Sequence, residues 1–415
     1  MKRLKKIVRV ILLFVIGVIL VVNAIILLTG RFYIYKGIKE TYLKGRIGPT
    51  IYDHDTFYNR TVDKGEGKVF EFPKHPKYNT QKIPDELREY IEELDTRALL
   101  VVKNDTLIYE EYWGEHDEAT MSNSFSVAKT IVAILVGIAI DDGLIDDIND
   151  PVCKYIPEFK SGGRDVITIK HLLEMASGLS WTESGSNPFS DNAESYYGTD
   201  LDGLVLRQKM VSEPGVEFKY QGGNSQLLAM IVEKVTGESI STYASKKIWS
   251  KLGMKEDAHW SLDKKDGQEK AFCCLYAQAR DFAKIGRMFM DGGAYDGEQI
   301  IPRWFFLQMT KQNDLTTEYG IPNYQYGYHV WTYRGLADEV IYCRGILGQY
   351  IIAIPSQDLL IIRLGLKRKD DFVIPDHLKN DEEYVNGVKY EVGHCLGLFQ
   401  YITVGKVLAA ESAAK

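Results

Sequence analysis

The chain has 415 residues, of which 45% are hydrophobic and 26% charged, and its formal net charge is −7 at pH 7. This composition is typical of a folded protein with a large hydrophobic core, and it lacks the excess of Lys and Arg that nucleic-acid-binding proteins carry. We therefore expect no nucleic-acid partner, and one domain of roughly 300 residues with appendages fits the length.

The first 30 residues are basic and then strongly apolar. Residues 2–9 carry five Lys or Arg side chains, and the 19 residues from 10 to 28 are apolar except for Asn23. As a helix, residues 10–28 would span about 28 Å, close to the thickness of a bilayer core. The charge ahead of this stretch favours a cytoplasmic N-terminus. Because no small-residue cleavage signal follows, we expect residues 1–30 to be an uncleaved signal anchor rather than a cleaved signal peptide. The rest of the chain would then be exported to the periplasmic or extracellular side.

Residues 31–90 show no strong periodicity, and we expect a stalk or a packed N-terminal extension. Pro84 favours the start of a short helix over residues 85–94. A hairpin is predicted next, with strands over 97–103 and 106–113.

A helix is predicted over residues 127–140, because this run is apolar and closes at Asp141-Asp142-Gly143. It is apolar nearly all round, so we expect it to be central and buried.

The rest of the chain is first helical and then strand-rich. Helices are predicted over 169–176, 226–235, 240–252, 279–291 and 302–311, strands over 327–333, 340–344, 349–354 and 359–364, and a last helix over roughly 393–407. Strands near both ends with helices between them indicate an α+β fold, with one antiparallel sheet built from both chain ends, covered by helices and joined to a helical subdomain. We place this domain at residues 91–408.

The five cysteines are odd in number and scattered. No Cys-x-x-Cys occurs, and the adjacent Cys273 and Cys274 are poor candidates for a disulfide. The eight histidines form no metal-ligand pattern. The sequence therefore predicts no metal site and no cofactor.

Ser126 and Lys129 form a Ser-x-x-Lys motif where the apolar helix begins. The two side chains lie one turn apart on the same face. A serine hydroxyl needs a neighbouring base to act as a nucleophile, and a lysine amine is a base only in its neutral form, which burial favours. The positive helix end also favours the oxyanion of an acyl-transfer intermediate. A Ser-x-x-Lys motif can also arise by chance. A lysine at the protein surface would have polar neighbours, however, whereas Lys129 lies in the apolar run.

A second pattern lies in residues 214–237, where Pro214-Gly215, Phe218, Tyr220, Leu227-Leu228, Glu233 and Thr236-Gly237 occur. With Ser-x-x-Lys, these residues resemble serine β-lactamase-related hydrolases of the class C type over about residues 90–365. The best likeness within that family is to the aminohexanoate-dimer (nylon-oligomer) hydrolase group, supported by residues 123–129, 258–263, 279–286 and 345–349.

The resemblance implies a β-lactamase and penicillin-binding-protein-like fold. It also implies Ser126 as nucleophile, Lys129 as general base and Tyr220 as the proton shuttle to the leaving group. A phenol beside an ammonium can relay a proton, so this assignment is chemically sound. The alternative for Tyr220, one of 26 tyrosines, is a core hydrogen bond.

The sequence departs from the family pattern after Tyr220. The usual Tyr-x-Asn is Tyr220-Gln221-Gly222, so the asparagine amide is missing. Asn224 either substitutes for it or only caps the helix.

The third family motif, Lys-Thr-Gly, is also absent, and its place falls at Cys343-Arg344-Gly345. Gly345 leaves room for a substrate beside the strand. Arg344 either binds a substrate carboxylate or faces water. The resemblance implies the backbone N–H groups of Ser126 and Ile346 as oxyanion donors.

Two further stretches spell class A motifs, Ser190-Asp191-Asn192 and Lys160-Ser161-Gly162, but in the wrong order and with the wrong flanks. The loop of residues 184–200, with Tyr196 and Tyr197, is a candidate wall of the substrate pocket. Gly-x-Ser-x-Gly does not occur, which argues against an α/β-hydrolase.

The sequence thus predicts a serine hydrolase that is held in a membrane through residues 10–28 and cleaves a small amide or ester. Two alternatives remain open. A D-alanyl carboxypeptidase acting on cell-wall peptides fits export but not the missing Lys-Thr-Gly. A catalytically inert, membrane-tethered binding protein would have lost Ser126, Lys129 or Tyr220, and all three are present.

Overall fold

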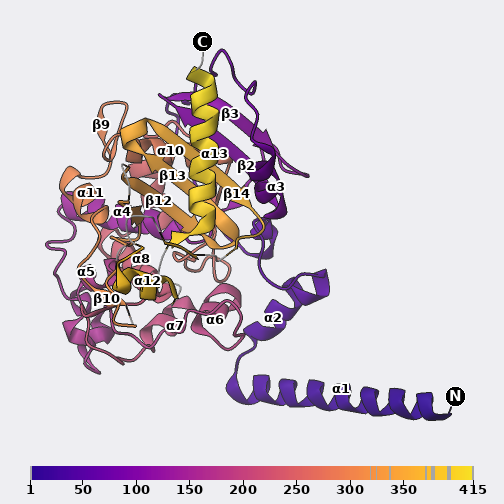
Figure 1. Ribbon diagram of the computed structural model, residues 1–415. Coiled ribbons are helices and arrows are strands. Elements are labelled where there is room, and N and C mark those ends of the chain that lie inside the picture. Colours follow the sequence, from indigo (N-terminus) through magenta and orange to yellow (C-terminus); the bar gives the residue numbers. More distant parts are fainter. Residues whose placement is uncertain are drawn as a thin grey trace.

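The computed structural model describes residues 2–317, 319–323, 325–335, 338–369, 372–374, 379–389 and 394–413. Its centre is a six-stranded sheet in the order β11-β12-β13-β14-β2-β3 (Figure 1), in which every neighbouring pair is antiparallel. The strands are β2 (Thr96–Lys103), β3 (Thr106–Tyr112), β11 (Trp331–Tyr333), β12 (Val340–Gly345), β13 (Gln349–Ile354) and β14 (Leu359–Gly365). Both ends of the domain therefore contribute to one sheet, which confirms the predicted α+β architecture.

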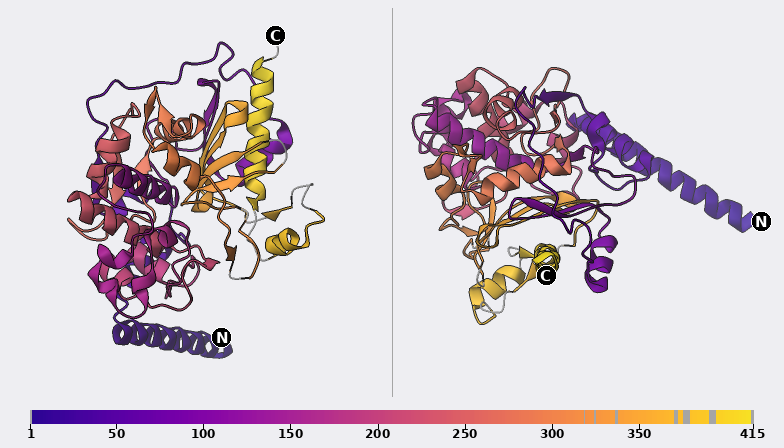
Figure 2. Two further views of the ribbon diagram at one scale, coloured as in Figure 1. Left: turned by 90° about the vertical axis from the view of Figure 1, so that its left-hand side faces the viewer. Right: turned by 90° about the horizontal axis from the view of Figure 1, so that it is seen from above.

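Helices cover both faces of this sheet (Figure 2). On one face, Ile351 and Leu360 pack with α10 (Ala279–Met290), and on the other, Ile352 and Ile361 pack with α13 (Leu396–Ala413). Every residue of β13 and β14 is buried, as expected for strands covered on both sides.

The helical side of the domain is organised around α4 (Val127–Asp141), which is buried along nearly its whole length and packs on α8 (Gly222–Thr236). This confirms the central position predicted from its apolar sequence. The other helices are α3 (Asp85–Glu93), α5 (Ile169–Leu173), α6 (Asp191–Tyr197), α7 (Leu201–Leu206), α9 (Ile240–Ala244), α11 (Arg303–Met309) and α12 (Glu382–Lys389).

A smaller sheet leads the chain into α4. Its order is β1-β6-β7-β4, from β1 (Asn59–Val62), β6 (Ala258–Ser261), β7 (Leu275–Ala277) and β4 (Ser122–Asn123). Because β4 ends just before Ser124, this sheet fixes where the chain turns into α4. The remaining pairs are β5 (Glu217–Phe218) with β10 (Thr316–Thr317), β8 (Ala294–Tyr295) with β9 (Glu298–Gln299), and β15 (Phe372–Val373) with β16 (His394–Cys395).

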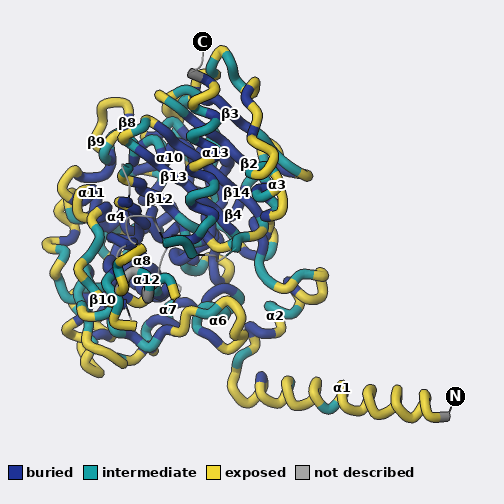
Figure 3. The backbone as a smooth tube through the Cα atoms, in the orientation of Figure 1, coloured by how far each residue is buried: buried dark blue, intermediate teal, exposed yellow. Residues whose placement is uncertain are grey.

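The chain begins with α1 (Lys2–Thr29), which is exposed along almost all of its length (Figure 3). Residues 3–29 of α1 are long and apolar enough to cross a membrane, a property that signal sequences share. A short helix, α2 (Tyr33–Glu40), follows.

Several element boundaries differ from the prediction. Helix α8 begins at Gly222, four residues before its predicted start. The prediction missed residues 222–225 because they are small or polar and carry no apolar periodicity. The helix predicted over 240–252 is α9 followed by a π-helical turn, Ser245–Trp249. The first residue of the predicted last helix, Gly393, lies outside the described residues.

Cys273 and Cys274 form a disulfide, so the prediction that these neighbours are poor partners is wrong. The backbone at Cys274 has a φ of 66°, a left-handed conformation that a side-chain-bearing residue seldom adopts. Sequence spacing does not reveal such a backbone turn. Cys153, Cys343 and Cys395 are free thiols.

Candidate active site

A sharp turn before α4 presents Ser126 at the N-terminus of that helix. The Ser124 N–H donates to the Leu275 carbonyl at 2.9 Å, and the Phe125 N–H donates to Asn123 Oδ1 at 2.8 Å. Phe125 has a φ of 46°, which is strained for a bulky residue and persists only where the surroundings fix it. The small sheet and the Asn123 side chain provide that restraint.

Lys129 is directed at Ser126 from one turn further along α4. Its Nζ donates to Ser126 Oγ at 3.0 Å and to the Phe272 carbonyl at 2.7 Å. The Lys129 side chain is only 1% exposed. The amine is therefore held within hydrogen-bond reach of the hydroxyl whose proton it would accept.

Tyr220 lies against the same lysine. Lys129 Nζ is 5.0 Å from the centre of the Tyr220 ring, and that ring stacks on Trp331 at 5.9 Å between centroids. The Tyr220 hydroxyl makes no hydrogen bond to another residue in the described part of the chain. The structure thus brings Ser126, Lys129 and Tyr220 together.

A cavity of about 410 Å³ opens over Ser126 and Tyr220, a size suited to a small organic ligand. Its lining residues are Ser126, Glu183, Gly185, Asn192, Phe218, Lys219, Tyr220, Thr317, Tyr319, Gln325, Trp331, Arg344, Gly345, Ile346 and Arg368.

Three of the expected binding residues, at the end of β12, lie in the wall of this cavity. A Cβ at Gly345 would lie 2.3 Å from the Ser124 carbonyl oxygen, so only glycine lets the strand come this close to the turn that presents Ser126. The Arg344 guanidinium carbon stands 3.7 Å over the Trp331 ring. Ile346 follows and is partly exposed to the cavity.

Asn224 and Tyr196 do not line the cavity. Asn224 Oδ1 accepts a hydrogen bond from Ser177 Oγ at 2.7 Å, and the N-cap of α8 is Gln221, so Asn224 is not the cap. Because α8 starts earlier than predicted, Asn224 lies inside its first turn, with its side chain in the buried interior. The Tyr196 hydroxyl donates to Asp53 Oδ2 at 3.0 Å.

Glu183 is a cavity residue that the sequence analysis missed. Its Oε2 accepts hydrogen bonds from the Gly222 N–H and from Trp181 Nε1, each at 2.7 Å. A Cβ at Gly222 would lie 3.3 Å from the same oxygen. The Glu183 carboxylate therefore stands beside the position at which the family pattern has asparagine. The two residues are 39 positions apart, and no spacing rule connects them.

The loop of residues 184–200 contributes Gly185 and Asn192 to the wall. Asn192 belongs to the Ser190-Asp191-Asn192 stretch that was set aside as a class A motif. Asn192 lines the cavity because of where this loop lies, and not as part of that motif. Trp331 and Arg368 were also missed, because neither belongs to a recognisable motif.

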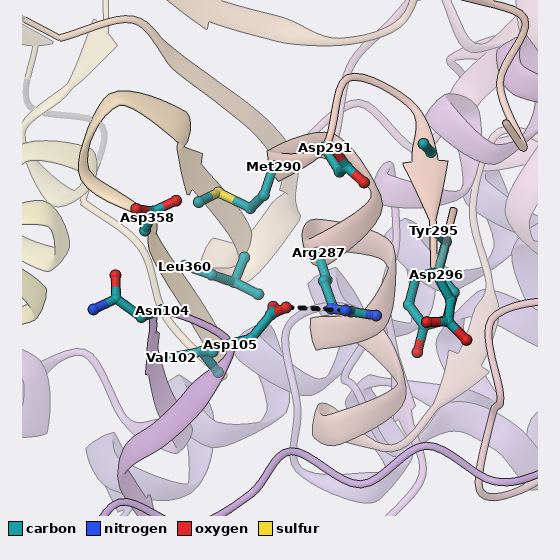
Figure 4. Close-up of a pocket in the computed structure, with 11 residues that line it drawn as sticks. Val102, Asn104, Asp105, Arg287, Met290, Asp291, Tyr295, Asp296, Asp358 and Leu360 are labelled. Carbon is teal, nitrogen blue, oxygen red and sulfur yellow. Dashed lines mark hydrogen bonds and ion pairs between the residues drawn. The ribbon is translucent and has the colours of Figure 1, made fainter. Parts of the chain in front are cut away.

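A second cavity, of about 440 Å³, lies between the β2–β3 turn, α10 and β8 (Figure 4). Its acidic groups come largely from turns, and Arg287 already pairs with Asp105 at 2.8 Å. None of the residues that line it is a serine, lysine or cysteine, so it holds no candidate nucleophile for acyl transfer.

A family model described as "Beta-lactamase" matches residues 87–377, which include the whole Ser126 cavity. The chain belongs to the beta-lactamase family. This beta-lactamase family member is 28% identical over 307 residues to the 6-aminohexanoate-dimer hydrolase of Paenarthrobacter ureafaciens, covering 68% of this chain and 76% of the relative.

Solved structures share the fold of this beta-lactamase family member. A Bacillus anthracis protein proposed to be a 6-aminohexanoate-dimer hydrolase has a TM-score of 0.67 at 21% identity, covering 82% of this chain and 93% of that one. A family VIII carboxylesterase has a TM-score of 0.56 at 16% identity, covering 78% and 99%. The family match and the curated relative together identify the chain as a serine hydrolase.

Proposed function

We propose that this serine hydrolase cleaves a small amide or ester through an acyl-enzyme on Ser126, with Lys129 as general base and Tyr220 as proton shuttle. The observation that carries the proposal is the 3.0 Å hydrogen bond from Lys129 Nζ to Ser126 Oγ at the cavity. The Ser126 hydroxyl and the Tyr220 phenol line one small cavity, and the buried Lys129 amine lies directly behind them, which is the arrangement that nucleophilic catalysis needs.

In the first half-reaction, Lys129 accepts the Ser126 proton while Oγ attacks the substrate carbonyl carbon. The backbone N–H groups of Ser126 and Ile346 would stabilise the oxyanion. The C–N or C–O bond then breaks, and the proton reaches the leaving group through the Tyr220 hydroxyl. In the second half-reaction, water attacks the acyl-enzyme, gives up its proton to the same groups, and releases the acid and Ser126.

The cavity wall favours some substrates over others. The amide of Tyr-x-Asn and the lysine of Lys-Thr-Gly are absent, so we expect poor β-lactam hydrolysis. Arg344 offers a guanidinium to a substrate carboxylate. Because a relative hydrolyses the 6-aminohexanoate dimer by name, short linear amides with a free carboxylate are the first amides to test, beside simple esters.

We also propose that α1 anchors the protein in a membrane and that the catalytic domain is exported. The length and apolar character of residues 3–29 support the anchor. The basic residues at the start of α1 support a cytoplasmic N-terminus.

The test is fluorophosphonate labelling of the full chain in detergent, read by intact mass and peptide mapping, with Ser126→Ala as the matched control. One adduct on Ser126, absent from the control, is the expected result. Ester turnover that survives Ser126→Ala contradicts the proposal. Slow and stable acylation by penicillin, without amide or ester turnover, would instead favour the D-alanyl carboxypeptidase alternative.

A further inference from the structure

The segment that follows α1 is attached to the loop that walls the cavity. Arg31 donates from one guanidinium nitrogen to the Phe189 carbonyl at 2.5 Å, and the Tyr33 hydroxyl donates to the Pro188 carbonyl at 3.0 Å. Helix α2 also packs on α6. The loop of residues 184–200 is therefore fixed to α2 while its Gly185 and Asn192 line the cavity.

Helix α2 also folds back along the end of α1. The Tyr35 hydroxyl donates to Asn23 Oδ1 at 2.6 Å. Ile26 is only 1% exposed because it packs with Tyr33 and Ile34. Asn23 precedes the end of α1 by six residues, which corresponds to about 9 Å along the helix axis.

This contact sets the depth of α2 if α1 spans a bilayer. The 27 residues of the candidate span extend about 40 Å, the thickness of a bilayer with its headgroup layers. A helix packed against the last two turns of α1 then lies in the headgroup layer and at its border with the hydrocarbon.

The exposed side chains of this region suit that layer. Ile47 is 94% exposed and Leu43 77% exposed, and Phe32, Tyr42 and Phe189 are also exposed. Aromatic side chains are enriched at membrane interfaces, and apolar side chains gain free energy on leaving water.

We propose that Phe32, Tyr42, Leu43, Ile47 and Phe189 form a lipid-contact surface that docks the loop of residues 184–200 on the outer face of the bilayer. The proposal rests on membrane anchoring by α1 and not on the reaction at Ser126. Docking holds the mouth of the cavity at the bilayer surface, whereas a stalk would hold it away from the membrane. The cavity then receives substrates from the membrane–water interface.

The test uses the full chain with Cys153→Ser, which removes the partly exposed free thiol. A fluorophore is placed at Phe189→Cys or Ile47→Cys, and the protein is reconstituted into phosphatidylcholine–phosphatidylglycerol vesicles that carry a nitroxide on some headgroups. The matched control is Leu307→Cys on α11, 53% exposed and on the opposite side of the domain from α2 (Figure 1). We expect the nitroxide to remove most of the emission at residues 189 and 47 and little at residue 307.

Vesicle flotation after a carbonate wash separates the two ways to fail. Protein that does not float shows that α1 is no anchor, and the docking proposal falls with it. Protein that floats but is quenched equally at residues 189 and 307 overturns docking and leaves anchoring intact. Fluorophosphonate labelling of Ser126 in the same samples tests the proposed reaction independently of docking, and circular dichroism reports on folding.

Discussion

The floor and the wall of the cavity are built in different ways. The floor is Ser126, the N-cap of α4, with the buried Lys129 directly behind it on that helix, which is buried along nearly its whole length. The wall is mixed: strands supply Trp331 and Gly345, which are buried, whereas loops supply the exposed residues Glu183, Gly185 and Ile346. We infer that core packing fixes the positions of Ser126 and Lys129, whereas the exposed part of the wall can change, and substrate choice with it, at little cost in stability.

The strongest test of this comparison is Lys129→Met at the floor. We expect kcat/KM to fall by about 10²–10⁴-fold, the usual contribution of a general base. Methionine fills a similar volume without a buried amine, so the melting temperature should not fall. Steady-state kinetics on a neutral ester, beside thermal unfolding, measures both. A variant that keeps its rate would show that Lys129 only supports the fold.

The Gly345→Ala substitution changes the point at which the floor and the wall of the cavity meet. The new Cβ would lie 2.3 Å from the Ser124 carbonyl oxygen, so either the end of β12 or the turn before Ser126 must move. A misplacement of about 1 Å can cost roughly 10²-fold in rate, and we expect a loss of that order for every substrate. Gly185→Ala is the matched control, since nothing lies within 4 Å of the added Cβ. Equal activity of the two variants would contradict the inferred close approach.

Arg344→Gln tests the wall alone. If the guanidinium binds a substrate carboxylate, its loss removes a charged hydrogen bond of about 1.5–3 kcal/mol, or roughly 10–100-fold in kcat/KM. The loss should appear with carboxylate-bearing amides and be absent with a neutral ester. Equal losses on both substrates would mean that Arg344 supports the wall rather than selecting the substrate.

The same division explains what the sequence could predict. The apolar run before Gly143 placed α4, Ser126 and Lys129, because an apolar helix has one stable location, the core. The strands β12, β13 and β14 were placed within a residue for the same reason. Glu183 and Trp331 were missed because loops and long-range packing bring them to the cavity. Asn224 was misplaced because small and polar residues gave no sign that α8 had already begun.

The smallest expected effect comes from Lys270, a buried side chain that supports the cavity wall from beneath. Lys270 Nζ donates to the carbonyls of Ser195 and Tyr196, in the last turn of α6, at 3.0 and 2.9 Å. Burial, with a smaller contribution from the charge of Lys36, lowers the pKa of Lys270 to about 7 from an ordinary value of 10.5. A neutral amine still has two N–H groups for these two carbonyls.

The pKa of Lys270 makes the free energy of unfolding depend on pH. Between pH 7 and 10.5 the unfolded chain carries a proton on this lysine that the folded protein lacks, so stability rises with pH, by up to about 1.4 kcal/mol per pH unit. Burial and Glu269 raise the pKa of Glu233 to about 8, so this carboxyl makes stability fall with rising pH, but only below pH 8.

Urea unfolding of the detergent-solubilised chain at pH 8.5 and 9.5 therefore isolates Lys270 when the native protein is compared with Lys270→Met. The variant should lose up to about 1.4 kcal/mol of the increase over that pH unit while retaining ester hydrolysis. If the free energy of unfolding changes equally with pH in both proteins, Lys270 stays protonated in the folded state. An ammonium would then hold the wall in place from below.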